Sequence, residues 1–342
     1  MRLTFAYPTS PGESTGGVVA LFEFANALSR RGHDVRFLHG PEWPTRIGSL
    51  DELPEKCQGH GVQHFLVDAI DDPAVPDGDI VFLSDAPVRY GLPAVIVQGY
   101  GMLSPELEDA VFRVPAPKVC VARWLIDTGI GLGAPAEQFV HAPCGIDHDI
   151  FQVRTPLEDR PIDVAALFHP HREKGWPDLL AALHRIVEMR PGTRGVVFAR
   201  NKPPQELPMG IEFVHSPDHQ QLATEVYGRT RVFVQASLRE GFGLTPVEAM
   251  ACGATLVTTD NGGSHDYGID GVTARVTPPG DPEALATATV GLLNDDAERQ
   301  RLGRAGVDHV QQFRWDRSAE KLEQFLERYR SDPAAFQHPA QY

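Results

Sequence analysis

Residues 3–38 read LTFAYPTSPGESTGGVVALFEFANALSRRGHDVRFL. The apolar runs at residues 3–7 and 35–38 have the length of buried strands, and a helical pattern separates them. Five apolar side chains recur there at the spacing of one helix face, which predicts a helix over residues 18–29 that ends near Gly32: Val18, Leu21, Phe22, Ala25 and Leu28. Strand, helix and strand in this order predict two parallel strands with a helix packed across them.

The same alternation continues along the chain. In the first half, further strands are expected at residues 64–67, 80–83, 94–98 and 118–121. In the second half, they are expected at residues 163–168, 195–199, 232–235 and 255–258, with helices over 178–189 and 246–251. The pattern loosens around Pro156 and Pro161, where we place a domain boundary.

The sequence therefore predicts an α/β protein of two doubly wound parallel sheets, with domains at residues 1–155 and 156–316. In open sheets of this kind, ligands bind beyond the carboxyl ends of the strands. We expect the two domains to face each other across a cleft that holds both sets of loops.

Composition and charge restrict the class of protein. The chain has 342 residues, of which 42% are hydrophobic and 23% charged, as in ordinary globular proteins. No run approaches the ~20 apolar residues that cross a bilayer, and the first residues resemble a strand rather than a signal peptide. We therefore expect a cytoplasmic protein that does not associate with membranes.

The formal net charge is −15, of which residues 1–150 contribute −10. Such a surface argues against nucleic acid or an anionic membrane as the main partner. The four cysteines, at positions 57, 120, 144 and 252, form no Cys-x-x-Cys pair, which favours reduced buried thiols over a disulfide or zinc site.

Two glycines, Gly16 and Gly17, stand between the first strand and its helix. They would let backbone amides at the helix N-terminus approach an anion or a sugar hydroxyl closely, although a plain tight turn explains them equally well. The segment lacks the Gly-x-Gly-x-x-Gly pattern, which argues against a nicotinamide or flavin enzyme.

Residues 169–175 read HPHREKG and join an expected strand to the next helix. Cationic side chains at the carboxyl end of a strand are placed to neutralise a diphosphate, and the candidates are His169, Arg172 and Lys174. A solvated surface lysine is the alternative interpretation. The histidines lack cysteine or carboxylate partners at metal-ligand spacing, so no metal site is expected.

Residues 239–253 read REGFGLTPVEAMACG and are the most informative stretch for function. Gly241 and Gly243 bracket a turn, while Pro246 suits the first helical position and Gly253 the helix end. The predicted helix directs its first amides toward the ligand edge of the sheet, where they suit a phosphate: Gly243, Leu244 and Thr245. A second loop on this edge is predicted at residues 261–266, NGGSHD.

Two carboxylates flank the turn. Glu248 follows Thr245 at the spacing of a capping box, which would explain it structurally. Glu240 lies before the turn and outside any cap geometry, so we expect a hydroxyl-rich ligand as its partner. Two glutamates that grip the two ends of a nucleotide sugar would account for the whole segment.

Residues 240–254 resemble the Glu-x7-Glu signature of family 4 of the retaining glycosyltransferases, which have the GT-B fold of two facing Rossmann-like domains. Other pieces match in family order: Gly16-Gly17, residues 31–35, residues 143–147 with Phe151, Lys174-Gly175, residues 261–263, residues 278–285 and residues 313–315. The resemblance covers most of the chain and is strongest from about residue 163 to 325.

The resemblance implies that Glu240 and Lys174 form the catalytic centre and that Glu248 binds the ribose. The donor site would comprise Gly16, Gly17, His169, Arg172, Lys174, Glu240, Gly241, Phe242, Gly243, Leu244, Thr245 and Glu248. A final helix over residues 317–330 would cross back to the N-terminal domain. No metal or cofactor is implied beyond the nucleotide-diphosphate sugar itself.

The sequence departs from the family pattern at three points. His169 stands where many members have an arginine, for which Arg172 would compensate. The segment around Gln98 and Tyr100 lacks the family's acceptor-side histidine and is similar to members with Val-Gln-x-Tyr, some of them rhamnosyltransferases. We therefore expect Gln98 and Tyr100 on the acceptor side. Asp266 stands where a glutamate is more usual.

The expected activity is retaining, metal-independent transfer of a hexose from a nucleotide-diphosphate sugar to a hydroxyl. The acidic first domain favours a neutral or amino-bearing small molecule or glycan as the acceptor. Two other classes stay open: a GT-B nucleotide-sugar hydrolase or epimerase, and a non-catalytic nucleotide-sugar-binding subunit. The paired glutamates and Lys174 argue against the non-catalytic subunit.

Overall fold

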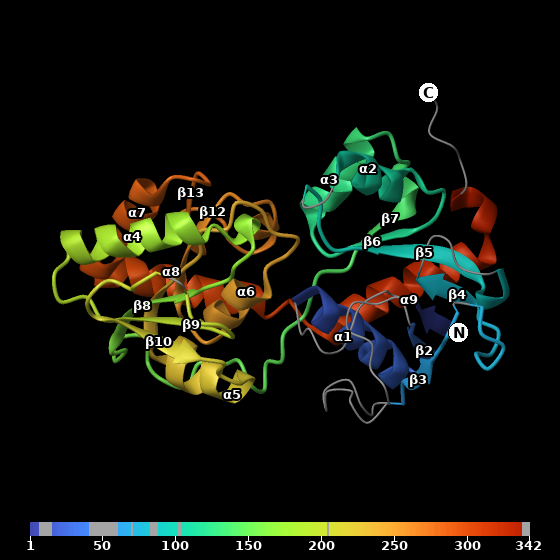
Figure 1. Cartoon of the computed structure of the whole chain (residues 1–342), viewed down its shortest axis with the longest axis horizontal. Coiled ribbons are helices and arrows are strands. Elements are labelled where there is room, and N and C mark those ends of the chain that lie inside the picture. Colours follow the sequence, from blue (N-terminus) through green and yellow to red (C-terminus); the bar gives the residue numbers. More distant parts are fainter. Residues whose placement is uncertain are drawn as a thin grey trace. The chain divides into compact units, whose positions relative to one another are not determined.

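The computed structural model describes residues 1–6, 16–40, 61–69, 71–82, 88–101, 104–203 and 205–336. The chain divides into two compact units (Figure 1). Unit 1 comprises Met1–Gly145 and Trp315–Tyr342, and unit 2 comprises Ile146–Arg314. Each unit is built around one parallel sheet, which confirms the predicted α/β class. That the two sheets face each other across a cleft stays a prediction.

The sheet of unit 1 has the strand order β3-β2-β1-β4-β5-β6-β7, and neighbouring strands pair in parallel. Its strands are β1 (Arg2–Phe5), β2 (Asp34–His39), β3 (Gln63–Leu66), β4 (Ile80–Phe82), β5 (Leu92–Val97), β6 (Lys118–Cys120) and β7 (Phe139–His141). Its helices are α1 (Gly16–Arg30), α2 (Pro105–Arg113), α3 (Arg123–Gly131) and α9 (Trp315–Ser331), with short turns η3 (Val88–Tyr90), η4 (Ala136–Gln138) and η9 (Pro333–Phe336).

The core of unit 1 is aromatic. Phe5 of β1 is in register with Phe37 and Phe82 on the neighbouring strands, and its ring centroid lies 5.8 and 4.5 Å from theirs. The helix predicted over residues 18–29 is α1, and Gly32 ends it with a φ of 88°, a left-handed conformation that favours glycine. Other predicted positions lie outside the described residues: Tyr7, Cys57 and Leu83.

The helix expected over residues 317–330 is α9, which packs along α1 within unit 1 (Figure 1). The Trp315 ring meets the edge of Phe24, with centroids 5.2 Å apart. Glu323 of α9 accepts hydrogen bonds from Arg31, and its other oxygen lies 3.0 Å from Nε2 of His33. These contacts fix α9 to the first strand–helix–strand segment.

The boundary between the units falls between residues 145 and 146, rather than between 155 and 156 as the prolines suggest. Ile146 donates its N–H to the Phe313 carbonyl at 3.1 Å, and Arg160 donates to the Thr230 carbonyl at 2.9 Å. Both partners belong to unit 2. Residues 146–160 therefore belong to unit 2 because of the atoms they contact, although their composition is that of a linker.

The sheet of unit 2 has the strand order β10-β9-β8-β11-β12-β13, again with parallel neighbours. Its strands are β8 (Ile162–Leu167), β9 (Gly195–Ala199), β10 (Ile211–His215), β11 (Thr230–Val234), β12 (Thr255–Thr259) and β13 (Ala274–Thr277). Its helices and turns are η5 (Arg172–Lys174), α4 (Trp176–Met189), α5 (His219–Gln221), η6 (Leu222–Val226), η7 (Tyr227–Arg229), α6 (Leu244–Ala251), η8 (Gly263–Asp266), α7 (Pro282–Asn294) and α8 (Asp296–Val310).

Helices α4 and α7 lie side by side over the sheet of unit 2 (Figure 1). Their buried faces meet the central strands in one apolar core, which includes Leu179, Leu183 and Val232. The four strands predicted in this half are β8, β9, β11 and β12. The edge strands β10 and β13 were not predicted. Each is half-exposed and carries polar residues that interrupt its apolar run.

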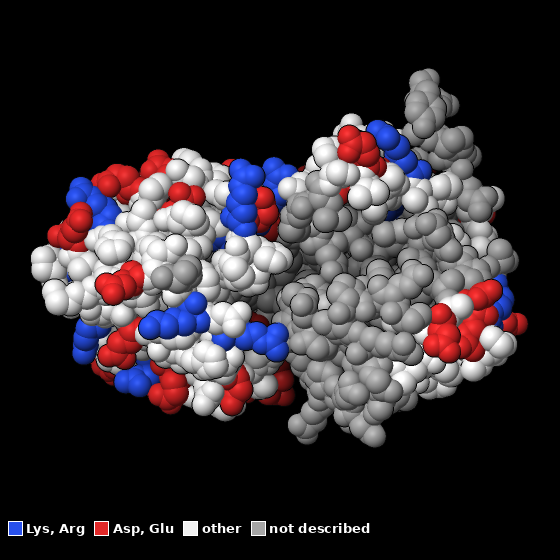
Figure 2. Space-filling view, viewed as in Figure 1, with Lys and Arg blue, Asp and Glu red and all other residues white. Residues whose placement is uncertain are grey.

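Basic and acidic side chains are interspersed over the face of unit 2 in Figure 2 rather than gathered by sign. Within the described ranges, no helix is both long and apolar enough to cross a membrane.

Candidate functional site

The strand order of unit 2 changes direction between β8 and β11. β8 pairs with β9 on one side and with β11 on the other, so the loops after β8 and β11 leave the sheet at the same edge. Ligands bind at such a switch point in open α/β sheets, because the loops there diverge to opposite faces. These two loops hold residues 168–175 and 235–243, which are the segments predicted to carry function.

The two loops touch through their backbones. Leu238 donates its N–H to the Glu173 carbonyl at 2.8 Å. Gly175 adopts a φ of 64°, and a Cβ atom at this position would come within 2.0 Å of the Ala236 carbonyl oxygen. Only glycine fits this approach. The glycine after Lys174 therefore lets the β8 loop close on the β11 loop.

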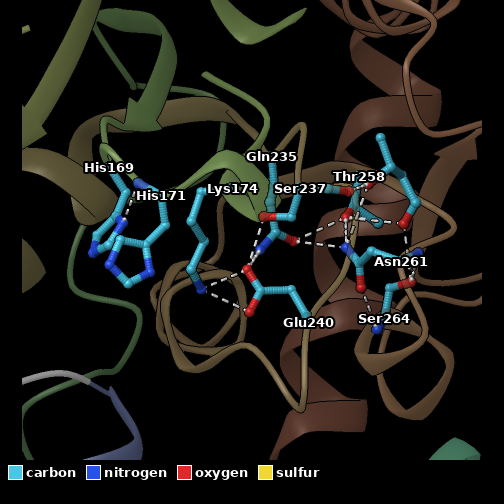
Figure 3. A network of polar contacts seen from close by, with 10 residues as sticks. His169, His171, Lys174, Gln235, Ser237, Glu240, Thr258, Asn261 and Ser264 are labelled. Carbon is cyan, nitrogen blue, oxygen red and sulfur yellow. Dashed lines mark hydrogen bonds and ion pairs between the residues drawn. The ribbon is translucent and has the colours of Figure 1, made fainter. Parts of the chain in front are cut away.

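That approach brings Lys174 onto Glu240 (Figure 3). Lys174 Nζ lies 2.8 Å from both carboxylate oxygens of Glu240. Oε1 also accepts hydrogen bonds from Ser237 Oγ at 2.7 Å and from Gln235 Nε2 at 3.1 Å. Glu240 is only 5% exposed, whereas the Lys174 side chain is 34% exposed. The carboxyl group is thus buried and held by four hydrogen bonds.

Glu240 has protein partners of its own, and that it also binds a hydroxyl-rich ligand stays a prediction. Its protein partners already occupy Oε1, so a ligand hydroxyl would have to approach Oε2. Lys174 has three N–H groups, and two of them are directed at Glu240. The third proton of the ammonium can still be donated to an anion.

His169 stands beside this pair in a defined protonation state. Its Nδ1 accepts the backbone N–H of His171 at 3.2 Å, so the ring proton of the neutral form is on Nε2. Burial, with the charge of Lys174, lowers the pKa of His169 from its ordinary value. His169 is therefore a neutral N–H donor at pH 7. Arg172, which was expected to supply the missing charge, is exposed on η5.

The turn after Glu240 ends at α6, whose N-cap is Gly243 with a φ of 100° and no side-chain cap. Leu244 is the first helical residue, so Thr245 and Pro246 stand second and third. The predicted capping box between Thr245 and Glu248 is therefore wrong, and Pro246 is not at the first position. The first amides of α6 have no partner within the helix, as a bound anion requires.

Glu248 lies on α6, one turn into the helix. Its Oε2 accepts a hydrogen bond from the Tyr227 hydroxyl at 3.3 Å. Burial is the main cause that raises the pKa of Tyr227 well above its usual value, and the negative charge of Glu248 adds to it. Glu248 is thus held on the side of α6 that meets η7.

The ring of Phe242, within the turn, packs against the ring of Tyr267. Their rings meet edge to face with centroids 5.7 Å apart, and both are buried. The Tyr267 hydroxyl has no hydrogen-bond partner, and a Cβ atom at Gly243 would lie 2.5 Å from it. Gly241 is also buried in this turn. Gly243 is therefore required both by its φ and by the phenol beneath it.

The loop predicted at residues 261–266 joins the same site. Glu240 donates its N–H to the Asn261 carbonyl at 2.9 Å and pairs with Gly262 in an isolated parallel bridge. The Asn261 side chain is 3% exposed and reaches Gln235 and Thr258. Three further residues of the site are not predicted from the sequence: Gln235, Ser237 and Thr258. Their signal was a polar side chain directly after or near the end of an apolar strand.

The remaining predicted residues lie in unit 1. Gly16 and Gly17 are the first two residues of α1, so they belong to a different unit from the other predicted donor residues. Gln98, after β5, donates its Nε2–H to the Gly17 carbonyl at 3.0 Å. Tyr100 donates its hydroxyl to Asp109 at 2.8 Å. Gln98 and Tyr100 thus organise the carboxyl edge of the unit 1 sheet.

Comparison with known proteins adds three findings. Residues 162–295 match the family described as Glycosyl transferases group 1. A D-inositol 3-phosphate glycosyltransferase from Corynebacterium diphtheriae is 40% identical over 98 residues, 29% of this chain and 23% of that protein. A phosphatidyl-myo-inositol mannosyltransferase from Mycobacterium leprae is 27% identical over 258 residues, 72% of this chain and 67% of that protein.

In four of the D-inositol 3-phosphate glycosyltransferases, the matched segment spans 22% to 34% of the relative's length. Two solved structures share the fold over nearly the whole chain. Sucrose-phosphate synthase from Thermosynechococcus elongatus has a TM-score of 0.74 at 18% identity, covering 97% of this chain and 100% of that one. HepE from Anabaena, in complex with UDP-glucose, has a TM-score of 0.73 at 18% identity, covering 96% and 100%.

The shared architecture is that of the GT-B fold, with two Rossmann-like α/β units. Residues 162–295, within unit 2, are in addition similar to the family described as Glycosyl transferases group 1.

Proposed function

We propose that this protein is a retaining glycosyltransferase that moves a hexose from a nucleotide-diphosphate sugar to a hydroxyl acceptor. The observation that carries the proposal is the buried Glu240 carboxylate, held by Lys174 next to the uncapped N-terminus of α6. A hydroxyl-binding anion and an anion-binding helix end lie within four residues at the switch point of the sheet. A sugar joined to a diphosphate carries the two complementary groups in the same order: hydroxyls on the sugar, and negative charge on the diphosphate.

The donor would bind in three parts. The α6 amides, from Gly243 to Thr245, and the third N–H of Lys174 would take the diphosphate, and His169 would add a neutral N–H. Oε2 of Glu240 would accept hydroxyls of the transferred sugar. Glu248 would accept the ribose hydroxyls. HepE from Anabaena binds UDP-glucose, which makes UDP-sugars the first donors to test.

Bond cleavage at the anomeric carbon develops positive charge on the sugar and negative charge on the leaving diphosphate. Lys174 and the α6 amides are preorganised to stabilise that negative charge, while the Glu240 carboxylate faces the positive charge. The departing phosphate oxygen would take the acceptor proton on the same face of the ring, which retains the anomeric configuration. Neither a metal nor another cofactor is needed in this scheme.

The acceptor is proposed to be a neutral or amino-bearing small molecule or glycan, since residues 1–150 carry a net charge of −10. Gln98 and Tyr100 would line its side of the reaction. Productive transfer to an anionic lipid, with no preference for neutral or cationic acceptors, would contradict this assignment.

The experiment begins with thermal shift against UDP, dTDP, GDP and ADP, each with magnesium or EDTA. A ligand at ~100 times its dissociation constant adds ~2.7 kcal/mol to the folded state, which is measurable. A base-selective shift that EDTA leaves unchanged supports the donor site. Incubation with the matching sugar nucleotides then separates the classes: a glycosylated acceptor of retained configuration supports transfer, free sugar indicates a hydrolase, and binding without turnover indicates a non-catalytic subunit.

A further inference from the structure

Gln235 connects the two polar loops of the site. It directly follows β11, and its backbone N–H still pairs with Val257 of β12 at 2.9 Å. Its Nε2 donates to Glu240 Oε1 at 3.1 Å. Its Oε1 accepts from Thr258 Oγ1 at 2.9 Å and lies 3.5 Å from Asn261 Nδ2 (Figure 3). One amide therefore touches both Glu240 and the loop after β12.

The direction of this amide is fixed from a backbone group. The Ser264 N–H, which can only donate, points at Asn261 Oδ1 at 2.9 Å. Asn261 therefore presents its NH₂ group to Gln235 and Thr258. Gln235 must answer with its carbonyl oxygen, which leaves its own NH₂ group for Glu240. The opposite orientation would place an amide oxygen against a carboxylate oxygen.

We infer that Gln235 is a positioning residue: it fixes the rotation of the Glu240 carboxylate, so that Oε1 is saturated by protein donors and Oε2 is left for substrate. This inference rests on the proposed role of Glu240 in binding the donor sugar. Gln235 itself touches no substrate in this scheme. It acts by transmitting the backbone geometry of residues 261–264 to the carboxylate.

Backbone contacts also connect Glu240 to the loop at residues 261–264. Glu240 N–H bonds to the Asn261 carbonyl, and Glu240 bridges to Gly262. These contacts hold the Glu240 main chain, but they leave its side-chain torsions free. Lys174, Ser237 and Gln235 hold the side chain, and of these three Gln235 is the one that contacts Asn261 directly. The loop at residues 261–264 therefore positions both the main chain and the carboxylate of Glu240.

The charged and titratable groups around Glu240 come from three segments. Lys174 lies on η5, and its ammonium contacts both carboxylate oxygens. His169 lies in the loop after β8 and Tyr267 directly after η8, and each interacts electrostatically with Glu240. A second carboxylate placed at position 235 would therefore meet Glu240 with Lys174 as the neighbouring cation.

The decisive variant is Gln235→Glu, which keeps the size of the side chain. Its carboxylate would still accept from Thr258 and Asn261, but it would face Oε1 of Glu240 at about the distance of the present hydrogen bond. Repulsion between two carboxylates that close raises the pKa of the pair: at lower pH one shared proton replaces the amide N–H, and at pH 8 both groups ionise and repel each other. We expect kcat to fall roughly 10- to 100-fold at pH 8, as for a misplaced reacting group, and to recover as the pH is lowered toward 6. The affinity for the nucleotide alone should change less than twofold.

Two leucine variants complete the test. Gln235→Leu removes the hydrogen bonds to Glu240, Thr258 and Asn261 and should lower kcat at every pH, without recovery in acid. Gln300→Leu is the control in the same unit, because Gln300 lies on α8 and its Oε1 accepts a hydrogen bond from the Arg304 guanidinium at 2.8 Å. It should keep wild-type kcat and pH profile. A wild-type kcat and pH profile in Gln235→Glu would overturn the positioning role.

A stability measurement separates this inference from the proposed function. If the wild-type protein turns over no sugar nucleotide, the proposed function fails, and the melting temperature against pH decides the role of Gln235. Folded Gln235→Glu must take up a proton, so its deficit in melting temperature relative to wild type should shrink as the pH falls from 8 to 5. If the curves of melting temperature against pH were parallel for wild type and Gln235→Glu, the side chain at position 235 would not position the Glu240 carboxylate.

Discussion

Glu240 places a full negative charge in a site that is 5% exposed, and Lys174 is the cation that offsets it. The two partners are not equivalent, because the Lys174 side chain is 34% exposed and water can reach its ammonium. Loss of Lys174 would leave a buried carboxylate with only neutral donors, from Ser237 and Gln235. Loss of the Glu240 charge would leave an ammonium that water can solvate.

Lys174→Met should therefore destabilise the protein more than Glu240→Gln. We expect Lys174→Met to cost roughly 1–3 kcal/mol, the range for a buried group that loses its partner. Glu240→Gln keeps a carbonyl oxygen toward Ser237 and should cost clearly less. Urea unfolding of both variants measures the difference. If Lys174→Met lost no more unfolding free energy than Glu240→Gln, water would solvate the Glu240 carboxylate, and the expectation from its burial would be wrong.

At the scale of the element, α6 starts where it does because Gly243 is its N-cap. A φ of 100° excludes other residues, and the Tyr267 hydroxyl occupies the space of a Cβ atom. Gly280 is a matched control, because its φ is 75° and nothing lies within 4 Å of its Cβ position. Alanine would strain the backbone at both positions, but only at position 243 would its Cβ atom also clash with the Tyr267 hydroxyl.

Gly280→Ala should lose about 1–2 kcal/mol from its left-handed backbone alone. Gly243→Ala should lose more, and the excess should shrink when Tyr267→Phe is added, because the hydroxyl is the atom in the way. Tyr267→Phe alone should be neutral or stabilising, since the hydroxyl is buried without a partner. Denaturant unfolding of the four variants gives the comparison. An excess that Tyr267→Phe leaves unchanged would place the clash elsewhere.

The same elements show what a sequence can reveal. The apolar runs that became β8 and β11 located both loops of the site, because parallel strands bring their carboxyl ends to one edge. The start of α6 was misjudged, since the spacing of Thr245 and Glu248 fits a cap that the φ of Gly243 pre-empts. The direct contact of Glu240 with Lys174 has no signal in the local pattern, because Lys174 is 66 residues away and only the packed loops bring the two together; the family resemblance alone placed them in one centre.

At the scale of the whole molecule, unit 1 is closed by the last helix of the chain. His33 and Arg31, just after α1, meet Glu323 of α9. Burial lowers the pKa of His33 below its ordinary value of 6.5. Burial disfavours the charged form of Glu323, but hydrogen bonds and charges from Arg31 and His33 outweigh it and lower the pKa of Glu323. Both shifts bear on the docking of α9.

Both shifts act in the same direction when the pH falls. Below 6.5 the unfolded chain protonates His33 while the folded chain resists, so the stability that comes from neutral His33 is lost as the pH drops. The contribution of Glu323 is present above its ordinary value of 4.5 and is lost as the pH falls further toward its lowered pKa. Unit 1 should therefore lose stability from pH 7 to pH 5, before Glu323 begins to titrate.

Calorimetry between pH 7 and pH 5 tests this expectation. His33→Gln keeps an N–H donor for Glu323 but cannot titrate, so it should make the pH dependence of the unit 1 transition shallower. The remaining slope comes from His39 of β2, because burial lowers the pKa of His39 to about 3. His184→Gln is the control, because His184 is exposed on α4 of unit 2. It should leave the slope as in wild type. If His33→Gln and His184→Gln have the same slope, then the α1–α9 contact does not set the acid stability of unit 1, and groups elsewhere in its core must do so.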